Sequence, residues 1–523
     1  MIRVIRFMNF IQAGRHVGVR SLLICTTISS YVKCATGLVC LDGSFRFRNL
    51  TTNKSVNLIN NTDILYNCEI QRGMNTTAKM ADLPNLKSAN LLKLSDYDCI
   101  GFDLDYTLCE YNIATVVQME FEVLAKFMVE EKGYDPEFLL KPVTDKDIDF
   151  FHKGLLIDKN KGNIIHIDKN GTIYRASHGT TILNDDEIIK YYGKDKKWEV
   201  ANGFVNNILN AWEGPISEQI RALLDYFDMP ASLIFARIVD SLDAKLGKPA
   251  DIYKVWPDVL EGLINMYKRE HFSLNKGGFF PRLKANPAKF LNKCHPLLID
   301  WLKDIKKNKK VFLITGSHVD FASFTAEYCL GDDWKSLFDI IICYTRKPGF
   351  FTGGRPFIRL NGSEETDPVD LQDLQFGNIY SQGNWQELYQ FFKSTLNKTQ
   401  PKCLYFGDHL IQDIYTPAEY TKCDTVAIVE EMNAEGMANV NNLKGHQSSD
   451  ILTSKTWGSY FGDEKYGVDS IWASIIKKHS KCCVPSLTFL VNKPLNYEIN
   501  TFNNKEHENA DGFYPSLPIV LFK

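Results

Sequence analysis

An apolar run that ends in two closely spaced aspartates constrains this 523-residue chain more than any other feature. Residues Cys99–Phe102 predict a short buried strand, and Asp103, Asp105 and Thr107 follow it at every second position. Burying an unpaired carboxylate is costly, so a strand covered on both faces normally avoids such residues. At the carboxyl end of a parallel strand, however, these carboxylates face the crevice in which open α/β sheets bind ligands. Taken alone, the stretch also fits a strand followed by an ordinary acidic turn.

Three later apolar runs also end in polar or charged residues. They are Val311–Ile314 before Thr315-Gly316-Ser317, Phe338–Cys343 before Arg346-Lys347-Pro348, and Cys403–Phe406 before Gly407-Asp408 and Asp413. A lysine before Pro-Gly is usually a solvated loop residue, and a Gly-Asp pair often does no more than end a strand. Because the pattern occurs four times, we expect these side chains to meet at one edge of a parallel sheet.

The four motifs, in this order, resemble the haloacid dehalogenase superfamily. Within it, residues 101–108, 346–348, 379–381 and 407–409 are similar to the cytosolic purine 5′-nucleotidase family. The phrases at 153–155, 175–180, 347–351 and 455–459 add to this resemblance, which covers the chain from about residue 95 to its end. It implies an α/β fold with a doubly wound parallel sheet and an inserted α+β cap domain. It also implies hydrolysis of phosphate monoesters.

The chain is too long for one ordinary core, which predicts two or three domains. We assign 1–94 to an amino-terminal extension, and 95–118 with 291–523 to the catalytic core and a carboxy-terminal extension. Residues 119–290 are too numerous for a simple crossover connection, and by the resemblance they form the cap.

Hydrophobic periodicity predicts the elements of these domains. Helices are expected over 116–131, 218–227, 231–246, 255–269, 296–307, 320–330 and 385–396, and a further strand over 425–429. Alternating apolar residues between Gly154 and Gly179 predict antiparallel hairpins. The polar stretch 353–377 predicts a surface loop, and 433–449 a mobile one. The aromatic residues after Lys455 predict that the tail packs on the core, and the alternation of strands and helices favours a doubly wound sheet.

The resemblance implies a role for each residue that ends a strand. Asp103 is the expected nucleophile, and Asp105 the acid that protonates the leaving oxygen and then the base that activates water. Lys347 is expected to pair with both the nucleophile and the phosphate, and Thr315 and Gly316 to bind phosphoryl oxygens. An aspartate at position 105 is the phosphatase pattern, whereas a threonine there is the pattern of P-type ATPases.

A Mg²⁺ ion is the cofactor that the resemblance implies. Asp103, Asp408 and the backbone carbonyl of Asp105 are the expected ligands, since a hard cation prefers oxygen. Asp413 is expected to tune the metal without binding it.

The resemblance also places substrate contacts in the cap. His178, Asp240 and Arg237 occupy or adjoin nucleotide-binding positions of the purine nucleotidase, with a structural role as the alternative for each. Thr180 replaces the aromatic residue that this family has after His-Gly, and Arg237 replaces a small one, so purine specificity stays open. The predicted substrate is a nucleoside monophosphate or another small phosphomonoester. A slow family member that acts as a binding or regulatory protein is the alternative.

The composition of the chain limits which classes of binding partner and which cellular compartments fit it. The net charge of −3 gives no global attraction for nucleic acid, and no apolar run is long enough to span a membrane. The 13 cysteines show no metal-finger spacing, which favours a reducing compartment. We predict a cytoplasmic location, or a mitochondrial one if the basic, Ser- and Thr-containing residues 1–41 are a transit segment. The alternative for this segment is a poorly ordered extension from a misassigned start. The oligomeric state is left open, and a homo-oligomer is one of the options.

Overall fold

Strand β4 (Cys99–Phe102) lies inside a nine-stranded sheet of the computed structural model, between two parallel neighbours. Phe102 is paired with Leu313 on one side and with Phe406 on the other. Every residue of β4 is buried, and such complete burial is why the strand reads as a continuous apolar run. The structure describes residues 40–41, 44–45, 91–437, 450–502 and 511–521.

The central sheet has the order β13-β12-β14-β11-β10-β4-β15-β16-β19. Every strand in this order from β14 to the end of the sheet at β19 is parallel to its neighbours in that part of the sheet. Their bounds are β10 (Lys310–Ile314), β11 (Ile340–Cys343), β12 (Phe357–Asn361), β13 (Glu364–Val369), β14 (Ile379–Gln382), β15 (Cys403–Gly407), β16 (Cys423–Ile428) and β19 (Cys482–Val484). The fold is therefore mixed α/β with a large, mostly parallel central sheet, consistent with a Rossmann-like core.

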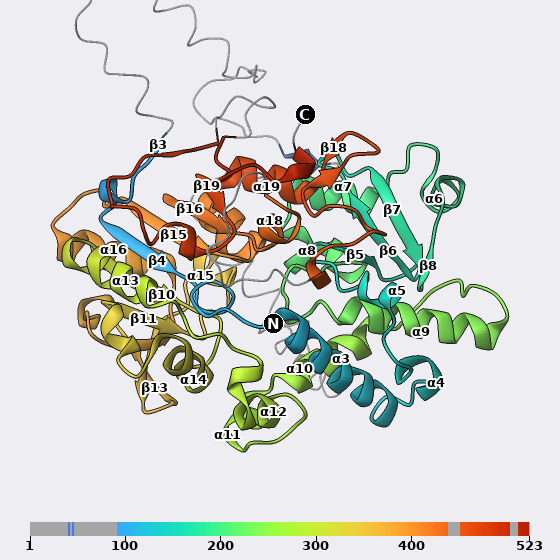
Figure 1. Ribbon diagram of the computed structural model, residues 1–523, viewed down its shortest axis with the longest axis horizontal. Coiled ribbons are helices and arrows are strands. Elements are labelled where there is room, and N and C mark those ends of the chain that lie inside the picture. The colour runs from blue at the N-terminus through green and yellow to red at the C-terminus, as the bar shows by residue number, and fades with distance from the viewer. Residues whose placement is uncertain (1–39, 42–43, 46–90, 438–449, 503–510, 522–523) are drawn as a thin grey trace, which may run out of the picture. The chain divides into compact units, whose positions relative to one another are not determined.

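Helices pack around this sheet, and α13, α14 and α16 are beside it in Figure 1. The predicted helices over 231–246 and 385–396 are confirmed with those bounds, and those near 116–131, 296–307 and 320–330 shift by at most three residues. None of the described helices is long and apolar enough to cross a membrane. The helices are α3 (Ile113–Glu130), α4 (Pro136–Leu139), α5 (Asp145–Ile148), α6 (Asp185–Tyr192), α7 (Glu199–Asn206), α8 (Asn210–Glu213), α9 (Ala231–Leu246), α10 (Trp256–Met266), α11 (Arg269–Ser273), α12 (Phe280–Ala285), α13 (Pro296–Asn308), α14 (Val319–Leu330), α15 (Gly349–Thr352), α16 (Trp385–Leu396), α17 (Thr416–Tyr420), α18 (Glu431–Ala434) and α19 (Ile471–His479).

A second, antiparallel sheet lies within the range predicted for the cap. Its order is β8-β7-β6-β5-β9, so the predicted hairpins between Gly154 and Gly179 are confirmed. The described residues from 91 onward belong to one compact unit, and the division into core and cap at 119 and 290 stays a prediction. The strands are β5 (Leu156–Asp158), β6 (Asn163–Ile167), β7 (Ile173–His178), β8 (Thr181–Ile182) and β9 (Ile220–Ala222).

The predicted helix over 218–227 is wrong. Residues Ile220–Ala222 form strand β9, which pairs antiparallel with β5 along the edge of the second sheet. Ile220 and Ala222 are buried, and the pairing with a distant strand outweighs the local helical preference.

The predicted surface loop over 353–377 is also wrong, because β12 and β13 form a hairpin at the end of the central sheet. Gly362 turns the chain between them with φ +63°, a conformation that glycine adopts without strain. All residues of β13 before Val369 are exposed, so this edge strand is polar and reads as a loop.

The carboxy-terminal tail packs on the core, as its aromatic residues predict. Trp457, Tyr460, Phe461 and Trp472 are each 0% exposed. Three two-residue strand pairs are also present. Residues 1–39 of the predicted transit segment (1–41) and residues 438–449 of the predicted mobile stretch (433–449) lie outside the described residues. The pairs are β1 (Cys40–Leu41) with β2 (Ser44–Phe45), β3 (Leu91–Leu92) with β20 (Ile499–Asn500), and β17 (Gly462–Asp463) with β18 (Val468–Asp469).

Trp472→Ala tests how much the tail contributes to stability. The indole is fully buried and its Nε1 donates a hydrogen bond of 2.8 Å to the Gly154 carbonyl. We expect the free energy of unfolding in urea to fall by about 3–5 kcal/mol, the usual cost of truncating a buried aromatic side chain. Tyr420→Ala, at a side chain 47% exposed, is the control and should cost well under half of that. Equal losses in the two variants would contradict the packing described.

Candidate active site

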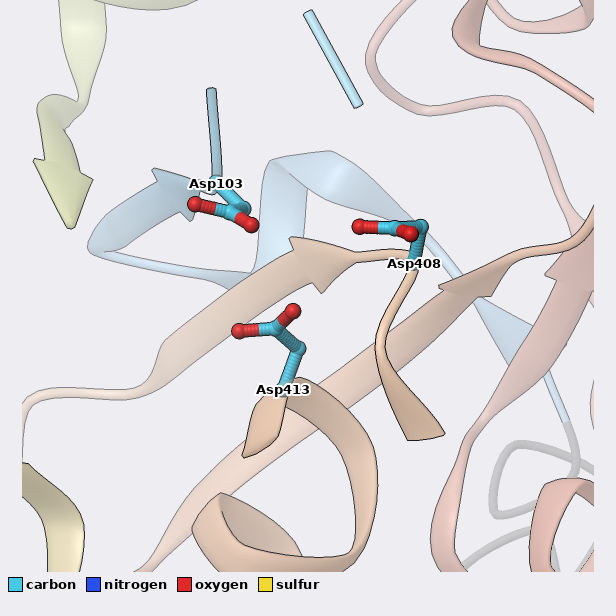
Figure 2. Close-up of side chains that lie close together, drawn as sticks. All are labelled: Asp103, Asp408 and Asp413. Atoms are coloured by element: carbon cyan, nitrogen blue, oxygen red, sulfur yellow. The ribbon is translucent and has the colours of Figure 1, made fainter. Parts of the chain in front are cut away.

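Three aspartate side chains meet where two adjacent strands of the central sheet end. Asp103 follows β4 and Asp408 follows β15, while Asp413 lies in the short π-helical segment η7 (Leu410–Tyr415). One carboxylate oxygen from each lies within 4.8 Å of the other two, and all three side chains are buried. Figure 2 shows the three carboxylates pointing toward one another. The predicted convergence of Asp103, Asp408 and Asp413 is therefore present.

Local backbone contacts hold this arrangement. The Asp103 amide donates a 2.8 Å hydrogen bond to the Phe406 carbonyl, which fixes the end of β4 against β15. The Asp413 carboxylate accepts a hydrogen bond from the His409 amide at 3.2 Å, so η7 folds back over the strand end. A Cβ added at Gly407 would lie 2.3 Å from the Cβ of Asp413. Glycine at position 407 is thus required for Asp413 to approach.

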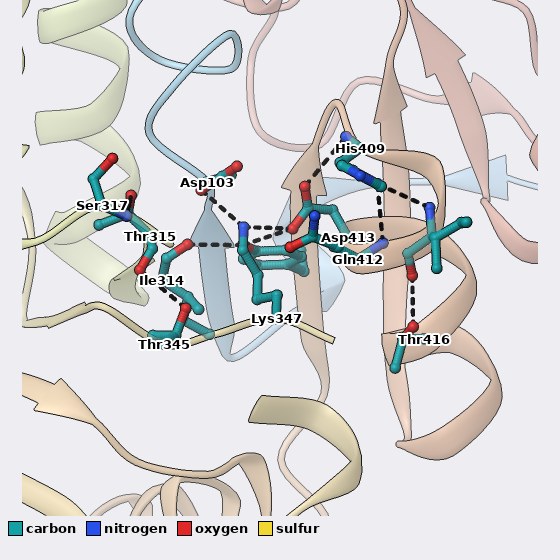
Figure 3. Close-up of polar contacts among 12 residues, drawn as sticks. Asp103, Ile314, Thr315, Ser317, Thr345, Lys347, His409, Gln412, Asp413 and Thr416 are labelled. Atoms are coloured by element: carbon teal, nitrogen blue, oxygen red, sulfur yellow. Dashed lines mark hydrogen bonds and ion pairs between the residues drawn. The ribbon is translucent and has the colours of Figure 1, made fainter. Parts of the chain in front are cut away.

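Lys347 joins two of these carboxylates. Its Nζ lies 2.9 Å from Asp103 Oδ1 and 2.6 Å from Asp413 Oδ1, and it also contacts the Tyr405 hydroxyl at 3.3 Å (Figure 3). The contact with Asp103 is an ion pair rather than a well-formed hydrogen bond, because Asp103 Oδ1 lacks a partner in hydrogen-bond geometry. The lysine is 7% exposed. The predicted pairing of Lys347 with the nucleophile position is present in the geometry.

The buried carboxylates resist ionisation. Burial raises the pKa of Asp103 well above its usual value, with Lys347 opposing this rise and Asp413 and Asp408 adding to it. Burial also raises the pKa of Asp408, to about 7. Burial lowers the pKa of Lys347, but Asp103 and Asp413 raise it by more, so the lysine stays charged. Protons and cations therefore compete for this cluster.

Asp105 lies beside this cluster and is held by different partners. Its Oδ1 accepts a 2.7 Å hydrogen bond from the Tyr111 hydroxyl, and its Oδ2 a 2.6 Å bond from the Ser317 hydroxyl. Burial raises the pKa of Asp105, and these two donors oppose the rise. Asp105 is thus oriented by two hydroxyls, and its pKa lies above the usual value. Ser317 and Tyr111 were not assigned roles from the sequence, although Ser317 stands in the second motif.

Thr315 and Gly316 follow β10, the other neighbour of β4. The Thr315 hydroxyl accepts a 3.1 Å hydrogen bond from the Ser317 amide, and the Thr345 hydroxyl donates to the Thr315 carbonyl at 2.9 Å. A Cβ added at Gly316 would meet no atom within 4 Å. The backbone at Gly316 therefore faces open space. The contact of Thr315 and Gly316 with phosphate stays a prediction.

The cluster suits a hard divalent cation. It offers several carboxylate oxygens at short range, and Asp103 Oδ1 is buried without a hydrogen-bond partner. Oxygen ligands of this kind are what Mg²⁺ and Ca²⁺ prefer, and the positive charge would relieve the repulsion between buried carboxylates. Asp413, predicted to act at one remove from the metal, is close enough here to be a ligand itself.

Lys153, which lies shortly before strand β5 of the second sheet, also reaches this cluster. Its side chain is 1% exposed, with Nζ 3.6 Å from Asp408 Oδ2 and 4.1 Å from the centre of the Tyr226 ring. Burial lowers its pKa, but Glu431, Asp408 and Asp225 raise it above the usual value. Sequence reasoning gave Lys153 no role, and the only signal was its place in the Lys153-Gly154-Leu155 phrase shared with the family.

The three predicted substrate residues of the cap do not join this cluster. His178 contacts Asn163 and Asp243, and Asp240 accepts hydrogen bonds from the Thr180 amide and hydroxyl. Arg237 is 0% exposed and forms an ion pair with Asp147 at 3.1 Å. Each contacts neighbours within 119–290, although Arg237 Nε is buried without a hydrogen-bond partner, and a contact of any of them with substrate stays a prediction.

A cavity of about 1430 Å³ opens beside Asp408. Tyr106 and Thr107, from the turn after β4, line it together with Tyr226. The Tyr106 and Thr107 hydroxyls are buried and have no hydrogen-bond partner. Residues 485–492 of the tail form another part of the wall, contributing Pro485, Ser486, Thr488, Phe489, Val491 and Asn492.

The class of the protein follows from comparison with known families. A profile described as the 5′ nucleotidase family matches residues 88–457, which contain all four motifs and the carboxylate cluster. The chain belongs to this 5′-nucleotidase family. Family membership supports an enzyme that hydrolyses phosphoric monoesters, and it suggests dependence on a divalent metal.

Individual relatives agree with this assignment. The chain is 35% identical over 458 residues to 5′-nucleotidase domain-containing protein 1 of Homo sapiens, covering 83% of this chain and 98% of the relative. The protein of the same name from Bos taurus is also 35% identical, over 457 residues and with the same coverage. The 5′-nucleotidase domain-containing protein 2 of Rattus norvegicus is 29% identical over 354 residues, 66% of this chain and 59% of that protein.

Metal binding should depend steeply on pH. The raised pKa of Asp408, about 7, means that this carboxyl must lose a proton before it can hold a cation. We therefore expect the affinity for Mg²⁺, measured by titration calorimetry, to fall by roughly tenfold or more between about pH 8.5 and about pH 5.5. Asp408→Asn should bind Mg²⁺ more weakly and with a flatter pH dependence. Equal wild-type affinities at the two pH values would contradict the assignment of Asp408 as a ligand.

Proposed function

We propose that the protein is a Mg²⁺-dependent phosphatase of nucleoside monophosphates that works through an aspartyl-phosphate on Asp103. One observation carries the proposal: a buried carboxylate at the end of β4 lies 2.9 Å from the Lys347 ammonium and within 4.8 Å of two further carboxylates. Such a site supplies a nucleophile, a fixed cation and oxygen ligands for a second, divalent cation. A phosphate dianion needs all three, because it repels an anionic nucleophile in water.

In the first step, an oxygen of Asp103 attacks phosphorus and the bond to the leaving alkoxide breaks. Asp103 attacks in its ionised form, which the positive charge of Lys347 favours, so no separate base is required. Lys347 also neutralises charge on the phosphoryl group. Asp105 gives its proton to the departing oxygen; its raised pKa suits this role, and the hydrogen bonds from Tyr111 and Ser317 orient its carboxyl group.

In the second step, Asp105, now ionised, takes a proton from water as that water attacks the phosphorus. The bond from phosphorus to Asp103 breaks, inorganic phosphate is released, and the site returns to its starting protonation state. Asp103, Asp408 and Asp413 would hold the Mg²⁺ ion, which supplies charge neutralisation and alignment of the phosphate when bound. Thr315 and the Gly316 amide would bind phosphoryl oxygens.

The leaving nucleoside has room in the cavity beside Asp408. Its volume exceeds the range of roughly 300–1,000 Å³ typical of small-molecule sites. The Tyr226 ring offers an apolar surface, and Tyr106 and Thr107 also line the cavity. A phosphatase of another small phosphomonoester would use the same chemistry with different cavity contacts.

Two substitutions separate the roles of the leading aspartates. Asp103→Asn removes the attacking oxygen, so turnover should vanish. Asp105→Asn keeps the nucleophile and should lower turnover of a nucleoside monophosphate by about 10²- to 10⁴-fold, the usual contribution of an acid–base group. With p-nitrophenyl phosphate, whose leaving group needs little protonation, Asp105→Asn should show a burst of nitrophenol and then stall. Rapid-quench measurements distinguish these outcomes.

The matched control is Asp413→Asn, which alters the cluster without removing nucleophile or acid and should give neither a burst nor complete loss. An active Asp103→Asn enzyme would refute the mechanism. A burst that is equally large in the wild type and in Asp105→Asn would argue against Asp105 as the base.

A phosphate-release screen tests the function itself. Purified protein with Mg²⁺ is offered nucleoside monophosphates and sugar phosphates, with Asp103→Asn as the blank. Release from nucleoside monophosphates supports the proposal, and release only from other monoesters redirects it to another substrate. Release from none, with Mg²⁺ binding intact, would favour a binding or regulatory protein.

A further inference from the structure

The backbone beside Lys153 is fixed by two segments that are distant in sequence. The Gly154 amide donates to the Leu223 carbonyl at 2.7 Å, and the Gly154 carbonyl accepts from Trp472 Nε1 at 2.8 Å. Gly154 has φ +91°, and a Cβ added there would lie 2.3 Å from Trp472 Nε1. The strand β5, which follows, is fully buried. The backbone next to Lys153 is therefore held in place, and this positions the lysine side chain near Asp408.

The Lys153 ammonium contacts one carboxylate and one aromatic ring. The side chain is almost fully buried, and its Nζ lies between Asp408 Oδ2 at 3.6 Å and the face of the Tyr226 ring at 4.1 Å. The Tyr226 hydroxyl donates to Glu431 at 2.8 Å, which holds the ring in place. A buried ammonium is costly unless carboxylates compensate it, and Asp408 is the carboxylate in ion-pair contact.

The charge of the cluster depends on this lysine. Asp103, Asp408 and Asp413, when ionised, carry three negative charges, and Lys347 and Lys153 carry two positive ones. Counted over these five groups alone, the net charge is −1 with Lys153 and −2 without it. In a buried site such a difference acts strongly on both a divalent cation and a phosphate dianion.

We propose that Lys153 is a positioning residue that sets the charge of the active site, weakening its hold on the divalent cation and strengthening its hold on phosphate. It holds the Asp408 carboxylate by an ion pair and offsets part of its charge. This balance between cation binding and phosphate binding matters for a phosphatase. Its site must hold a cation, but a site that is too negative would repel the anionic substrate. The inference rests on the proposed function for its purpose, but its test does not require turnover.

Lys153→Met is the direct test, since methionine nearly matches the buried stem and removes the charge. Titration calorimetry measures the Kd of Mg²⁺ alone, and then the Kd of inorganic phosphate at saturating Mg²⁺. We expect the Mg²⁺ Kd to fall by about tenfold and the phosphate Kd to rise by about tenfold. Lys153→Gln, a second neutral variant, should shift both constants in the same directions if the methionine variant does not fold.

Two controls separate charge from damage to the fold. Lys153→Arg keeps the positive charge and should hold both constants within about threefold of the wild type. Lys159→Met removes another largely buried lysine, whose Nζ donates to the Ser217 carbonyl and lies over the Trp256 ring, and it should leave both unchanged. Thermal unfolding confirms that each variant is folded.

The opposite signs of the two shifts make the result decisive. Weaker binding of both ligands in the neutral variants would show a merely structural role, and unchanged binding of both would show no role, so either outcome overturns the proposal. A wild type that binds Mg²⁺ and phosphate yet hydrolyses no monoester would contradict the proposed function alone. A wild type that binds neither ligand would overturn both.

Discussion

The ion pairs of Lys347 with Asp103 and Asp413 are the contacts on which the rest of the site depends. Three carboxylates buried within 4.8 Å of one another repel each other and lose hydration, and burial raises the pKa of Asp103 and Asp408. A buried lysine 2.9 Å and 2.6 Å from two of them offsets that cost. The remaining negative charge makes the cluster compatible with a divalent cation.

The fold brings these charges together by register rather than by any single loop. Strands β10, β4 and β15 are parallel neighbours, so Thr315, Asp103 and Asp408 emerge at one edge of the sheet. The turn before β5 brings Lys153 to that edge, and the tail helix α19 supports the neighbouring Gly154 carbonyl through Trp472. The tail thus supports the site as well as the core, and its residues 485–492 also line the adjacent cavity.

Sequence reasoning found the central strands and most of the cluster because both are local signals. A fully buried strand such as β4 is a continuous apolar run, and an acid at its end stands out against it. Strand β9 and the β12–β13 hairpin were mispredicted, because pairing with distant partners decides their conformation and exposed edge strands lack an apolar pattern. Lys153 was missed for the same reason: it lies 255 residues before Asp408, and only the tertiary structure brings the two together.

Reductive trapping of the phosphorylated enzyme tests the central assignment most directly. Wild-type protein is quenched in acid during turnover of a nucleoside monophosphate with Mg²⁺, then treated with borohydride, which reduces an acyl phosphate to an alcohol. The account predicts homoserine at position 103, detected by mass spectrometry of the peptide that carries Cys99–Phe102, and none in protein quenched without substrate. Homoserine at position 408 or 413 instead, or unmodified Asp103 in enzyme that is turning over, would contradict it.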